Sequence, residues 1–508
     1  MSELSAGRLE TSDNALLTGD SEVGAYLWTS VLLTGLLVLG VPVVATVTAI
    51  PTPILVVVAG LCYLAAVVAT GNAFEGLTSA VFVLALFDIA VTLAEGPGIA
   101  TADIVAVDVV AVPLLFVLLY DALDDGVSVR FNARSIAVFG FVAFVCWSFA
   151  AGIVGNGVSQ AAGLMSGIEQ LRYLVVFAVA LLVVRRKNVW CVVYPFVIAV
   201  AGNLLVSLAQ IKNGGMLGFP FLGEPPDRYL ESFTFLGHEI ATGFYAGGFV
   251  GHGRELAMVL FMFIPLVVAV SLRHSWPQVT LAGVAVAASV FSIRVADTDA
   301  GWGTLILLGV LFGAYLFATL VVRVKRRYST IAAVPVLGIG VACGVVLVRL
   351  VWAVFEVTDG IPLLRTNTLE VRLEEYVTAI QLAFKYPLFG IGGYNFYVMS
   401  EQFGLPPDTG VHNTILSHLA GTGFVGAFFY LLVIFTALYL TVRLAISTNG
   451  NERLLWVAVF CAMVAYHAYS SWMSSYHWTV GNSAFWLLCG ATIGAAGKRY
   501  RSRLGWPT

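Results

Sequence analysis

The chain has 508 residues, of which 59% are hydrophobic and 11% are charged. Soluble domains average about 45 to 50% apolar and about 25% charged residues, so this composition excludes a soluble globular protein and indicates a polytopic membrane protein. The 29 acidic and 26 basic residues give a net charge of −3. This balance provides neither the basic field of a nucleic-acid-binding protein nor an acidic tail, and no nucleic acid partner is expected.

The first 24 residues are polar and mildly acidic, with Glu3, Glu10 and Asp13 among them. They lack the basic start and short apolar core of a cleaved signal peptide. We therefore expect the N-terminus to be retained, with the first span acting as its own insertion signal.

Apolar runs bounded by polar or turn residues predict an all-α, polytopic membrane helix bundle. A helix that crosses a bilayer needs about 20 mostly apolar residues. We predict 12 to 14 transmembrane helices, because the run at 172–185 is short and those at 78–94 and 103–122 contain aspartates. The predicted spans are 25–47, 52–69, 78–94, 103–122, 134–155, 172–185, 189–210, 255–272, 276–294, 302–323, 330–355, 422–443, 453–471 and 480–497.

Basic residues in short loops predict the orientation, since such loops stay in the cytoplasm. With 14 spans, 17 of the 26 basic residues fall on one side, which makes both termini cytoplasmic. Nine basic residues remain for the outer side: Arg172, Lys212, Arg228, Arg254, Arg294, Arg349, Arg365, Arg372 and Lys385. For Arg172, Lys212 and Lys385 the favoured interpretation is an interfacial side chain that extends to the headgroups.

Two long loops divide the chain into seven segments. The loops are expected on the outer face, and loops of this length are usually functional or disordered. The predicted segments are a cytoplasmic N-terminus (1–24), an N-terminal transmembrane bundle (25–210), a first outer loop (211–254), central transmembrane helices (255–355), a second outer loop (356–421), C-terminal transmembrane helices (422–497) and a basic cytoplasmic tail (498–508).

The second outer loop contains an apolar stripe with helical spacing. The stripe predicts a helix that lies on the membrane surface or against the bundle, with Arg372 and Glu375 on its other side. A tight turn containing Pro387, Gly390 and Gly392 is expected to follow. The stripe consists of Leu373, Tyr376, Val377, Ile380 and Phe384.

Histidines and arginines gather in the predicted outer regions. Histidine is the side chain that acts as a neutral base near pH 7, and arginine suits bidentate contact with phosphate. Each single histidine is more simply interpreted as an interfacial side chain. Six of the seven histidines lie outside in this topology, namely His238, His252, His412, His418, His467 and His477.

No spacing typical of a metal site is present. Asp297 and Asp299 are two acids in a short loop, and such acids are more often solvated than metal-bound. We therefore predict no metal and no cofactor.

Residues 370–396 read EVRLEEYVTAIQLAFKYPLFGIGGYNF, and residues 411–426 read VHNTILSHLAGTGFVG. Together these segments resemble the signature region of the O-antigen ligase and O-antigen polymerase superfamily. The likeness lies in an arginine at the head of the outer helix, the PLFGIG turn at 387–392, the His412-Asn413 pair and the GFVG sequence at 423–426. Residues 247–257 and Ser292-Ile293-Arg294 match the family pattern more loosely, without its Pro-Asn.

The resemblance implies a metal-independent, inverting glycosyltransferase on the outer face of the cell membrane. His412 would be the general base, and Arg372 with Arg254 or Arg294 would bind the diphosphate of the donor. Asn413 and Tyr394 would orient His412 or the sugar. Glu375 is a supporting residue, with an i, i+3 ion pair to Arg372 as the alternative role.

The implied donor is a glycan on a polyprenyl or dolichyl diphosphate, and the acceptor is a glycan, a lipid or a protein. Membrane lipids are the other expected partners. Polymerase and ligase stay open as alternatives, because they differ only in the acceptor. A secondary transporter or lipid-linked oligosaccharide flippase is the alternative from another class, and it would use Asp88.

Overall fold

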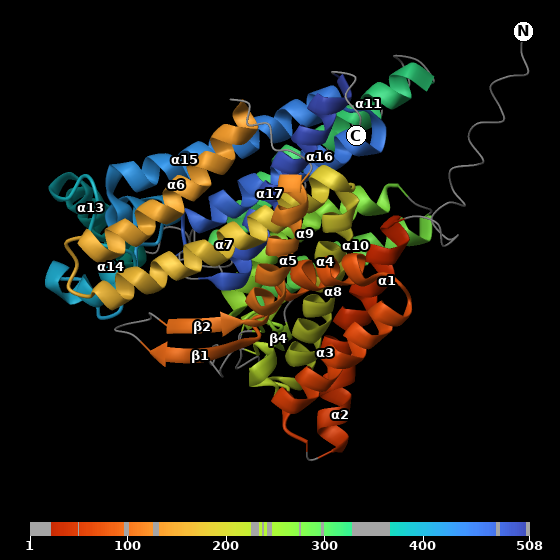
Figure 1. The fold of residues 1–508 in the computed structure, drawn as a ribbon, viewed down its shortest axis with the longest axis horizontal. Helices are drawn as coiled ribbons and strands as arrows, with labels where there is room; N and C mark the ends of the chain where they lie inside the picture. The colour runs from red at the N-terminus through yellow and green to blue at the C-terminus, as the bar shows by residue number, and fades with distance from the viewer. Residues whose placement is uncertain are drawn as a thin grey trace, which may run out of the picture.

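The computed structural model describes residues 22–48, 50–95, 101–124, 132–224, 233–235, 238–240, 246–273, 276–295, 299–327, 366–473 and 478–503. Long helices lie side by side in it and are tilted relative to one another (Figure 1). In the N-terminal half the helices and strands are α1 (Glu22–Gly35), the π-helix η1 (Leu36–Gly40), α2 (Val41–Val47), α3 (Thr52–Ala69), α4 (Ala73–Leu84), β1 (Ala90–Glu95), β2 (Thr101–Val105), α5 (Ala106–Asp124), α6 (Ala133–Val154), α7 (Gln160–Arg186) and α8 (Trp190–Asn213). The rest are η2 (Pro220–Leu222), β3 (Phe233–Phe235), β4 (His238–Ile240), α9 (Gly253–Ser271), α10 (Trp276–Val295), α11 (Asp299–Arg327), α13 (Thr366–Lys385), α14 (Asn395–Met399), η4 (Ser400–Phe403), α15 (Thr414–Ser447), α16 (Gly450–Ser470) and α17 (Thr479–Arg503).

Within this described part, 10 helices are long and apolar enough to cross a membrane. The all-α, multi-pass class predicted from composition is therefore confirmed. The helices α10 and α17 coincide with two further predicted spans, although the apolar part of α10 is short. The predicted span 330–355 lies outside the described residues, as do residues 1–21 of the N-terminal segment.

The predicted span at 78–94 is wrong. Helix α4 ends at Leu84, and the chain then turns into β1, which pairs antiparallel with β2. Each strand contains one valine and one threonine, and β2 also contains an isoleucine; these residues favour an extended backbone. Asp88 therefore lies in a turn and Asp103 lies in a strand, so neither is a mid-membrane helical acid.

Helices α6, α7, α15 and α17 pack around an aromatic core. The Phe141 ring lies 4.0 Å from Trp486 and 5.0 Å from Phe177, measured between centroids. Small residues let the backbones approach closely: a Cβ on Gly490 would lie 2.2 Å from the Phe177 carbonyl oxygen. Such small-residue contacts are the usual way membrane helices associate, since lipid provides little hydrophobic drive.

Two helices begin earlier than predicted, and polar caps explain both starts. Helix α7 begins at Gln160 instead of 172, because Ser159 accepts a hydrogen bond from the Ala162 N–H at 3.2 Å. Helix α15 begins at Thr414 instead of 422, capped by Asn413, and it bends at Gly423, which has φ 67°. Serine and asparagine are preferred N-caps, so these starts have a local cause.

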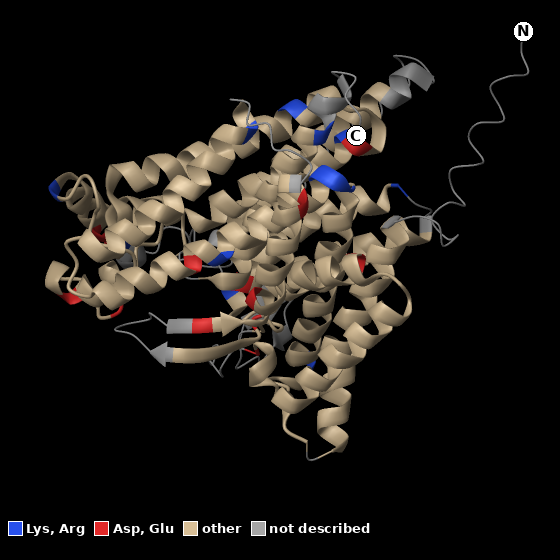
Figure 2. Cartoon of the chain, viewed as in Figure 1, with Lys and Arg blue, Asp and Glu red and all other residues tan. Residues whose placement is uncertain are grey.

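The two ends of the bundle differ in charge. Basic residues gather at the end formed by the N-terminus of α6 and the C-termini of α7, α15 and α17 (Figure 2). At this end Lys498 donates to the Lys187 carbonyl at 2.8 Å. Helices α13 and α14 and the β1–β2 hairpin lie toward the opposite end (Figure 1).

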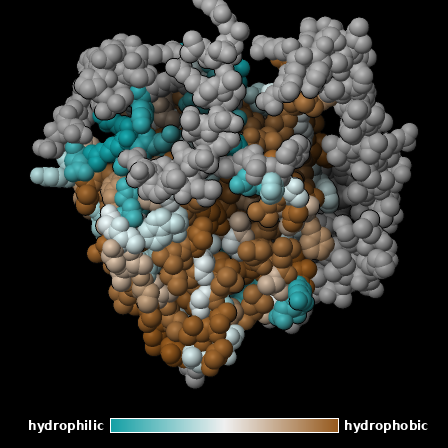
Figure 3. Space-filling view, turned by 90° about the vertical axis from the view of Figure 1, so that its right-hand side faces the viewer, coloured by the Kyte–Doolittle hydropathy of each residue, from teal (hydrophilic) through white to brown (hydrophobic). Residues whose placement is uncertain are grey.

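The surface on the side of α1 to α3 is largely hydrophobic in its lower half (Figure 3). Val31, Val43 and Val57 are more than half exposed there, at 54%, 58% and 62%. Exposed aliphatic side chains of this density are expected where helices contact lipid tails.

Candidate functional site

Helix α13 has an exposed side with apolar residues and a buried side that carries Glu375. Leu373, Val377, Ile380 and Phe384 of the predicted stripe are between 40% and 71% exposed. On the other side of the helix Glu375 is fully buried. The stripe therefore faces away from the protein, as expected of a helix at a membrane surface.

Glu375 binds His412 through both the ring and the backbone. Its two carboxylate oxygens lie 2.8 and 3.0 Å from His412 Nδ1, and Oε2 accepts the His412 backbone N–H at 2.9 Å. A carboxylate at Nδ1 keeps the proton on that nitrogen and leaves Nε2 as the basic atom. The His412 side chain is 27% exposed, so this base remains accessible.

The backbone around His412 is fixed to the end of α16. The Tyr376 hydroxyl lies 2.7 Å from the His412 carbonyl oxygen and 3.0 Å from that of Ser471. Burial raises the pKa of Tyr376 to about 12, so the hydroxyl remains a donor. Asn413 accepts the Leu416 N–H at 3.0 Å and donates to the Ser471 carbonyl at 3.4 Å. Asn413 thus caps α15, and the group that contacts the His412 ring is Glu375.

Two of the three predicted diphosphate ligands have unsatisfied donors. The Nε atoms of Arg372 and Arg254 are buried and have no hydrogen-bond partner among the described residues. The predicted alternative, an ion pair between Arg372 and Glu375, is not formed: Glu375 binds His412 instead. Buried donors without acceptors are rare in folded proteins, which sets these two arginines apart. The side chain of Arg294 lies outside the described residues.

Tyr394 lies away from His412. It has a positive φ of 60° at the start of α14, and its hydroxyl donates to Glu169 of α7. Because side chains rarely adopt this backbone conformation, the contact holds a strained residue. Tyr394 thus belongs to a second group of residues rather than to the surroundings of the His412 ring.

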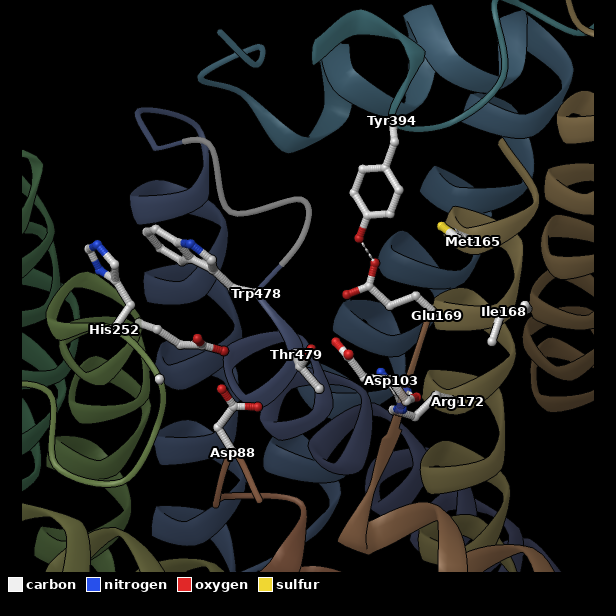
Figure 4. Close-up of a pocket in the computed structure, with 12 residues that line it drawn as sticks. Asp88, Asp103, Met165, Ile168, Glu169, Arg172, His252, Tyr394, Trp478 and Thr479 are labelled. Atoms are coloured by element: carbon white, nitrogen blue, oxygen red, sulfur yellow. Dashed lines mark hydrogen bonds between the residues drawn. The ribbon is translucent and has the colours of Figure 1, made fainter. Parts of the chain in front are cut away.

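This second group lines a cavity of about 260 Å³. Figure 4 shows Asp88 and Asp103 on opposite sides of Thr479, with the Tyr394–Glu169 hydrogen bond above. We refer to the space as the acidic cavity. Its lining comprises Asp88, Asp103, Met165, Ile168, Glu169, Arg172, Gly251, His252, Glu255, Tyr394, Trp478 and Thr479.

Arg172 is an ion-paired residue of this cavity, so the expectation of an interfacial side chain is wrong. Its side chain is 8% exposed. Its Nε lies 3.0 Å from both Asp108 carboxylate oxygens, and its Nη2 donates to the Asp103 carbonyl at 2.6 Å. A buried guanidinium needs such partners, because removing its charge from water is costly.

A polar scaffold holds the loop at 246–252 against α8. Asn203 accepts the Phe249 N–H at 2.9 Å, and Gln210 accepts the Gly248 N–H at 2.9 Å. Gln210 in turn donates to Glu224 at 2.9 Å. These buried bonds satisfy backbone groups that water cannot reach, and they fix the loop that carries Gly251 and His252.

Asp88 enters the cavity from the turn after α4. Its backbone N–H donates to the Phe249 carbonyl at 2.9 Å. Burial, together with the nearby Asp103 charge, raises its pKa to about 6, and Arg172 partly offsets the rise. The fold therefore shifts this carboxyl group toward its neutral form, and the group still ionises above about pH 6.

We expect Asp88→Asn to stabilise the fold more at pH 7.5 than at pH 4.5. The unfolded carboxyl ionises near its ordinary value of 3.8, whereas the folded one keeps its proton up to about pH 6. The protonated Asp88 therefore contributes its full stability below the unfolded pKa. That contribution is lost as pH rises through the folded pKa, so the wild type is less stable at pH 7.5. The free energy of unfolding gained by Asp88→Asn at pH 7.5 should be about 3 kcal/mol at most.

Thermal unfolding in detergent at both pH values measures this gain, with exposed Asp408→Asn as the control. An equal effect of Asp88→Asn at both pH values would contradict the assignment.

Within the described part of the chain, no group of three or more His, Cys, Asp or Glu side chains is arranged to hold a metal ion. Asp297, one of the two acids considered from the sequence, lies outside that part, and so does the side chain of Asp299. The structure therefore adds no metal ligands to those two candidates.

Comparison with known protein families and with curated proteins finds no match to this chain. By its helices, it is a multi-pass membrane protein with 10 candidate spans in the described residues.

Proposed function

We propose that this protein is a membrane glycosyltransferase that uses His412 as its general base. The observation that carries the proposal is the His412–Glu375 pair, with Nδ1 2.8 Å from the carboxylate and the ring partly exposed. A histidine oriented by a buried carboxylate is the standard arrangement for removing a proton from a hydroxyl group. The resemblance of residues 370–426 to O-antigen ligases and polymerases supports the same assignment.

In the proposed reaction the acceptor hydroxyl attacks the anomeric carbon of the donor sugar. The new bond joins this carbon to the acceptor oxygen, and the bond to the diphosphate oxygen breaks with its electron pair. The acceptor proton passes to His412 Nε2. The lipid diphosphate leaves with increased negative charge, and a single displacement inverts the anomeric carbon.

The arginines supply the charge that such a leaving group needs. Arg372 lies one turn before Glu375 on α13, and Arg254 lies at the N-terminus of α9. Their buried, unpartnered Nε atoms are donors ready for phosphate oxygens. Two guanidinium groups can hold a diphosphate without a metal ion, and Arg294 stays a candidate for the second position.

We place this site on the extracytoplasmic face, with both termini in the cytoplasm. The basic end of the bundle is the expected cytoplasmic end, and His412 lies just before α15, at the end of this helix opposite to Arg443. The exposed apolar stripe of α13 then lies at the outer membrane surface. A polyprenyl-linked or dolichyl-linked donor reaches His412 from that surface, and the acceptor is a glycan, a lipid or a protein.

Arg372→Gln is expected to lower transfer about 10- to 100-fold, since a hydrogen bond to a charged group contributes about 1.5 to 3 kcal/mol. Transfer is measured with purified enzyme and lipid-linked donor in proteoliposomes. Lys385→Gln, an exposed cation on the same helix, is the matched control and should retain full activity. If both variants lost the same fraction of the transfer rate, any positive charge on α13 would serve. Arg372 would then have no specific role.

The decisive test of the function is release of polyprenyl diphosphate from a polyprenyl-diphosphate-linked glycan, together with formation of a longer or newly attached glycan. The rival transport function has its own observation in its favour, since Asp88 lines a cavity together with residues of several helices. Movement of the intact donor across the vesicle membrane without diphosphate release would establish a flippase and refute the transferase.

A further inference from the structure

The acidic cavity has the features of a built binding site. Gly251 has φ 83°, and a Cβ at this position would lie 2.3 Å from Asp88 Oδ2. A glycine here therefore leaves room for the carboxylate. On the neighbouring helix Glu255 Oε1 accepts the N–H groups of Val480 and Gly481 at 2.6 and 2.9 Å. The Glu255 carboxylate is thus fixed in place by backbone contacts from a distant segment.

Some carboxylate oxygens that line the cavity accept no hydrogen bond from the described residues. Glu255 is 5% exposed and lines the cavity, yet only its Oε1 accepts hydrogen bonds from the described residues. No described group donates to the Asp88 carboxylate either, and Figure 4 shows this side chain pointing toward the cavity. Carboxylate oxygens that border a cavity and have no donor from the described residues can accept O–H or N–H groups of a ligand.

The acidic side chains of the lining disfavour an anionic ligand. Four acids border the cavity, namely Asp88, Asp103, Glu169 and Glu255. Arg172 is the one Lys or Arg in the described lining, and Asp108 pairs with it at 3.0 Å. A carboxylate or phosphate on the ligand would therefore find acceptors like itself and, among the described residues around it, no cation that is still unpaired.

Aromatic rings complete the lining. Tyr394 enters from α14, and Trp478 lies before α17, with its ring 6.0 Å from that of His252 and nearly parallel to it. Carboxylates that accept hydroxyl protons, beside apolar ring faces that cover C–H groups, suit a pyranose ring. The cavity volume of about 260 Å³ accommodates one such ring.

The acidic cavity is also connected to His412 through a short piece of chain. Ser471 receives hydrogen bonds from Tyr376 and Asn413 beside His412, and Trp478 lines the cavity seven residues later. Both groups of residues lie at the same end of the bundle, at the N-termini of α9, α15 and α17.

We propose that the acidic cavity binds one neutral or amino-bearing pyranose of the acceptor glycan and rejects acidic sugars. The assignment to the acceptor rests on the proposed transferase function, whereas pyranose binding itself does not. Asp88, Glu169 and Glu255 accept the hydroxyl or ammonium protons of the sugar. Tyr394 and Trp478 border its ring.

Binding is tested by saturation-transfer NMR on the full-length protein in nanodiscs. The probes are methyl β-glucopyranoside, methyl β-glucosaminide and methyl β-glucuronide. The first two should bind and the glucuronide should not. Asp88→Asn and Glu169→Gln should each weaken binding about tenfold, the effect of one hydrogen bond to a charged group. Glu401→Gln, an exposed acid on η4, is the control that leaves binding unchanged.

A second variant keeps the test valid if the buried acid variants fail to fold. Ile168 borders the cavity but is 44% exposed, so Ile168→Trp narrows the cavity without disturbing the core. This variant should also lose glycoside binding. The proposal is overturned if none of the probes binds, if the glucuronide binds as well as the glucoside, or if Ile168→Trp binds like the wild type.

Failure of the transferase would look different. In that case lipid diphosphate release would be absent while the glucoside still bound, and the cavity would remain a sugar site without an acceptor role. Conversely, His412-dependent release with no glycoside binding would refute the acidic cavity as the acceptor site and leave the transferase intact.

Discussion

His412→Gln is expected to lower glycan transfer about 100- to 10,000-fold, the range that a general base contributes. Glutamine keeps a polar group near Glu375 but has no basic nitrogen to take the acceptor proton. The structure predicts little loss of folded protein, because the His412 side chain is partly exposed and its backbone N–H still donates to Glu375. The measurement is the rate of polyprenyl diphosphate release in proteoliposomes, normalised to the amount of folded protein.

A matched histidine variant serves as the control for this experiment. The sequence places His274 on the predicted cytoplasmic side, and His274→Gln should transfer glycan at the wild-type rate. A second comparison separates the two function classes. If His412→Gln keeps full activity at normal expression while Asp88→Asn abolishes surface glycan, the transferase must be given up in favour of transport.

Local sequence patterns predict most of the bundle. Hydropathy alone locates α3, α6, α8 and α9 to within about three residues, and the period of the apolar stripe predicts α13. The backbone hydrogen bonds of a helix form within the helix itself. A local stretch of sequence is therefore enough to predict its position. The hairpin after α4 is different, since an apolar run of mixed Val, Thr and Ile fits either a helix or a strand.

The acidic cavity depends on contacts that no short pattern encodes. Glu169 meets Tyr394 across 225 residues, and Glu255 meets Val480 across 225 residues. The sixth predicted span starts at 172 and therefore leaves Glu169 out, although an acid three residues before Arg172 in an apolar run is a detectable signal. His412 and Glu375, in contrast, are 37 residues apart within the segment that the sequence already singled out.

Under the proposed function, the surroundings of His412 and the acidic cavity bind different substrates. Arg372, with an Nε unpaired among the described residues, lies three residues before Glu375 on α13, whereas acidic side chains dominate the lining of the acidic cavity. A diphosphate is drawn to the first and repelled by the second, and a neutral or amino sugar is favoured by the second. Opposite charge preferences of this kind direct donor and acceptor to separate places before they react.

Glu375→Gln is expected to lower the transfer rate at least about 100-fold, because it changes which ring nitrogen of His412 carries the proton; the same change in a serine protease triad costs about 10,000-fold. Glu375 Oε2 accepts both the backbone N–H and Nδ1, at 2.9 and 2.8 Å. If the glutamine oxygen keeps that place, its NH2 group faces Nδ1 as a second donor. The ring then favours the tautomer with its proton on Nε2, and the base is lost.

The adjacent residue provides the control for this change. Glu374 is exposed on the same turn of α13, and Glu374→Gln removes the same charge without touching His412. Glu375→Gln should reduce kcat with little change in the KM for the donor, while unfolding temperature shifts only slightly because the amide is isosteric. A structural role for Glu375 would instead lower the unfolding temperature and the amount of folded protein. Equal rates for Glu375→Gln and Glu374→Gln would show that His412 does not depend on the buried carboxylate, and the pair would lose its place in the mechanism.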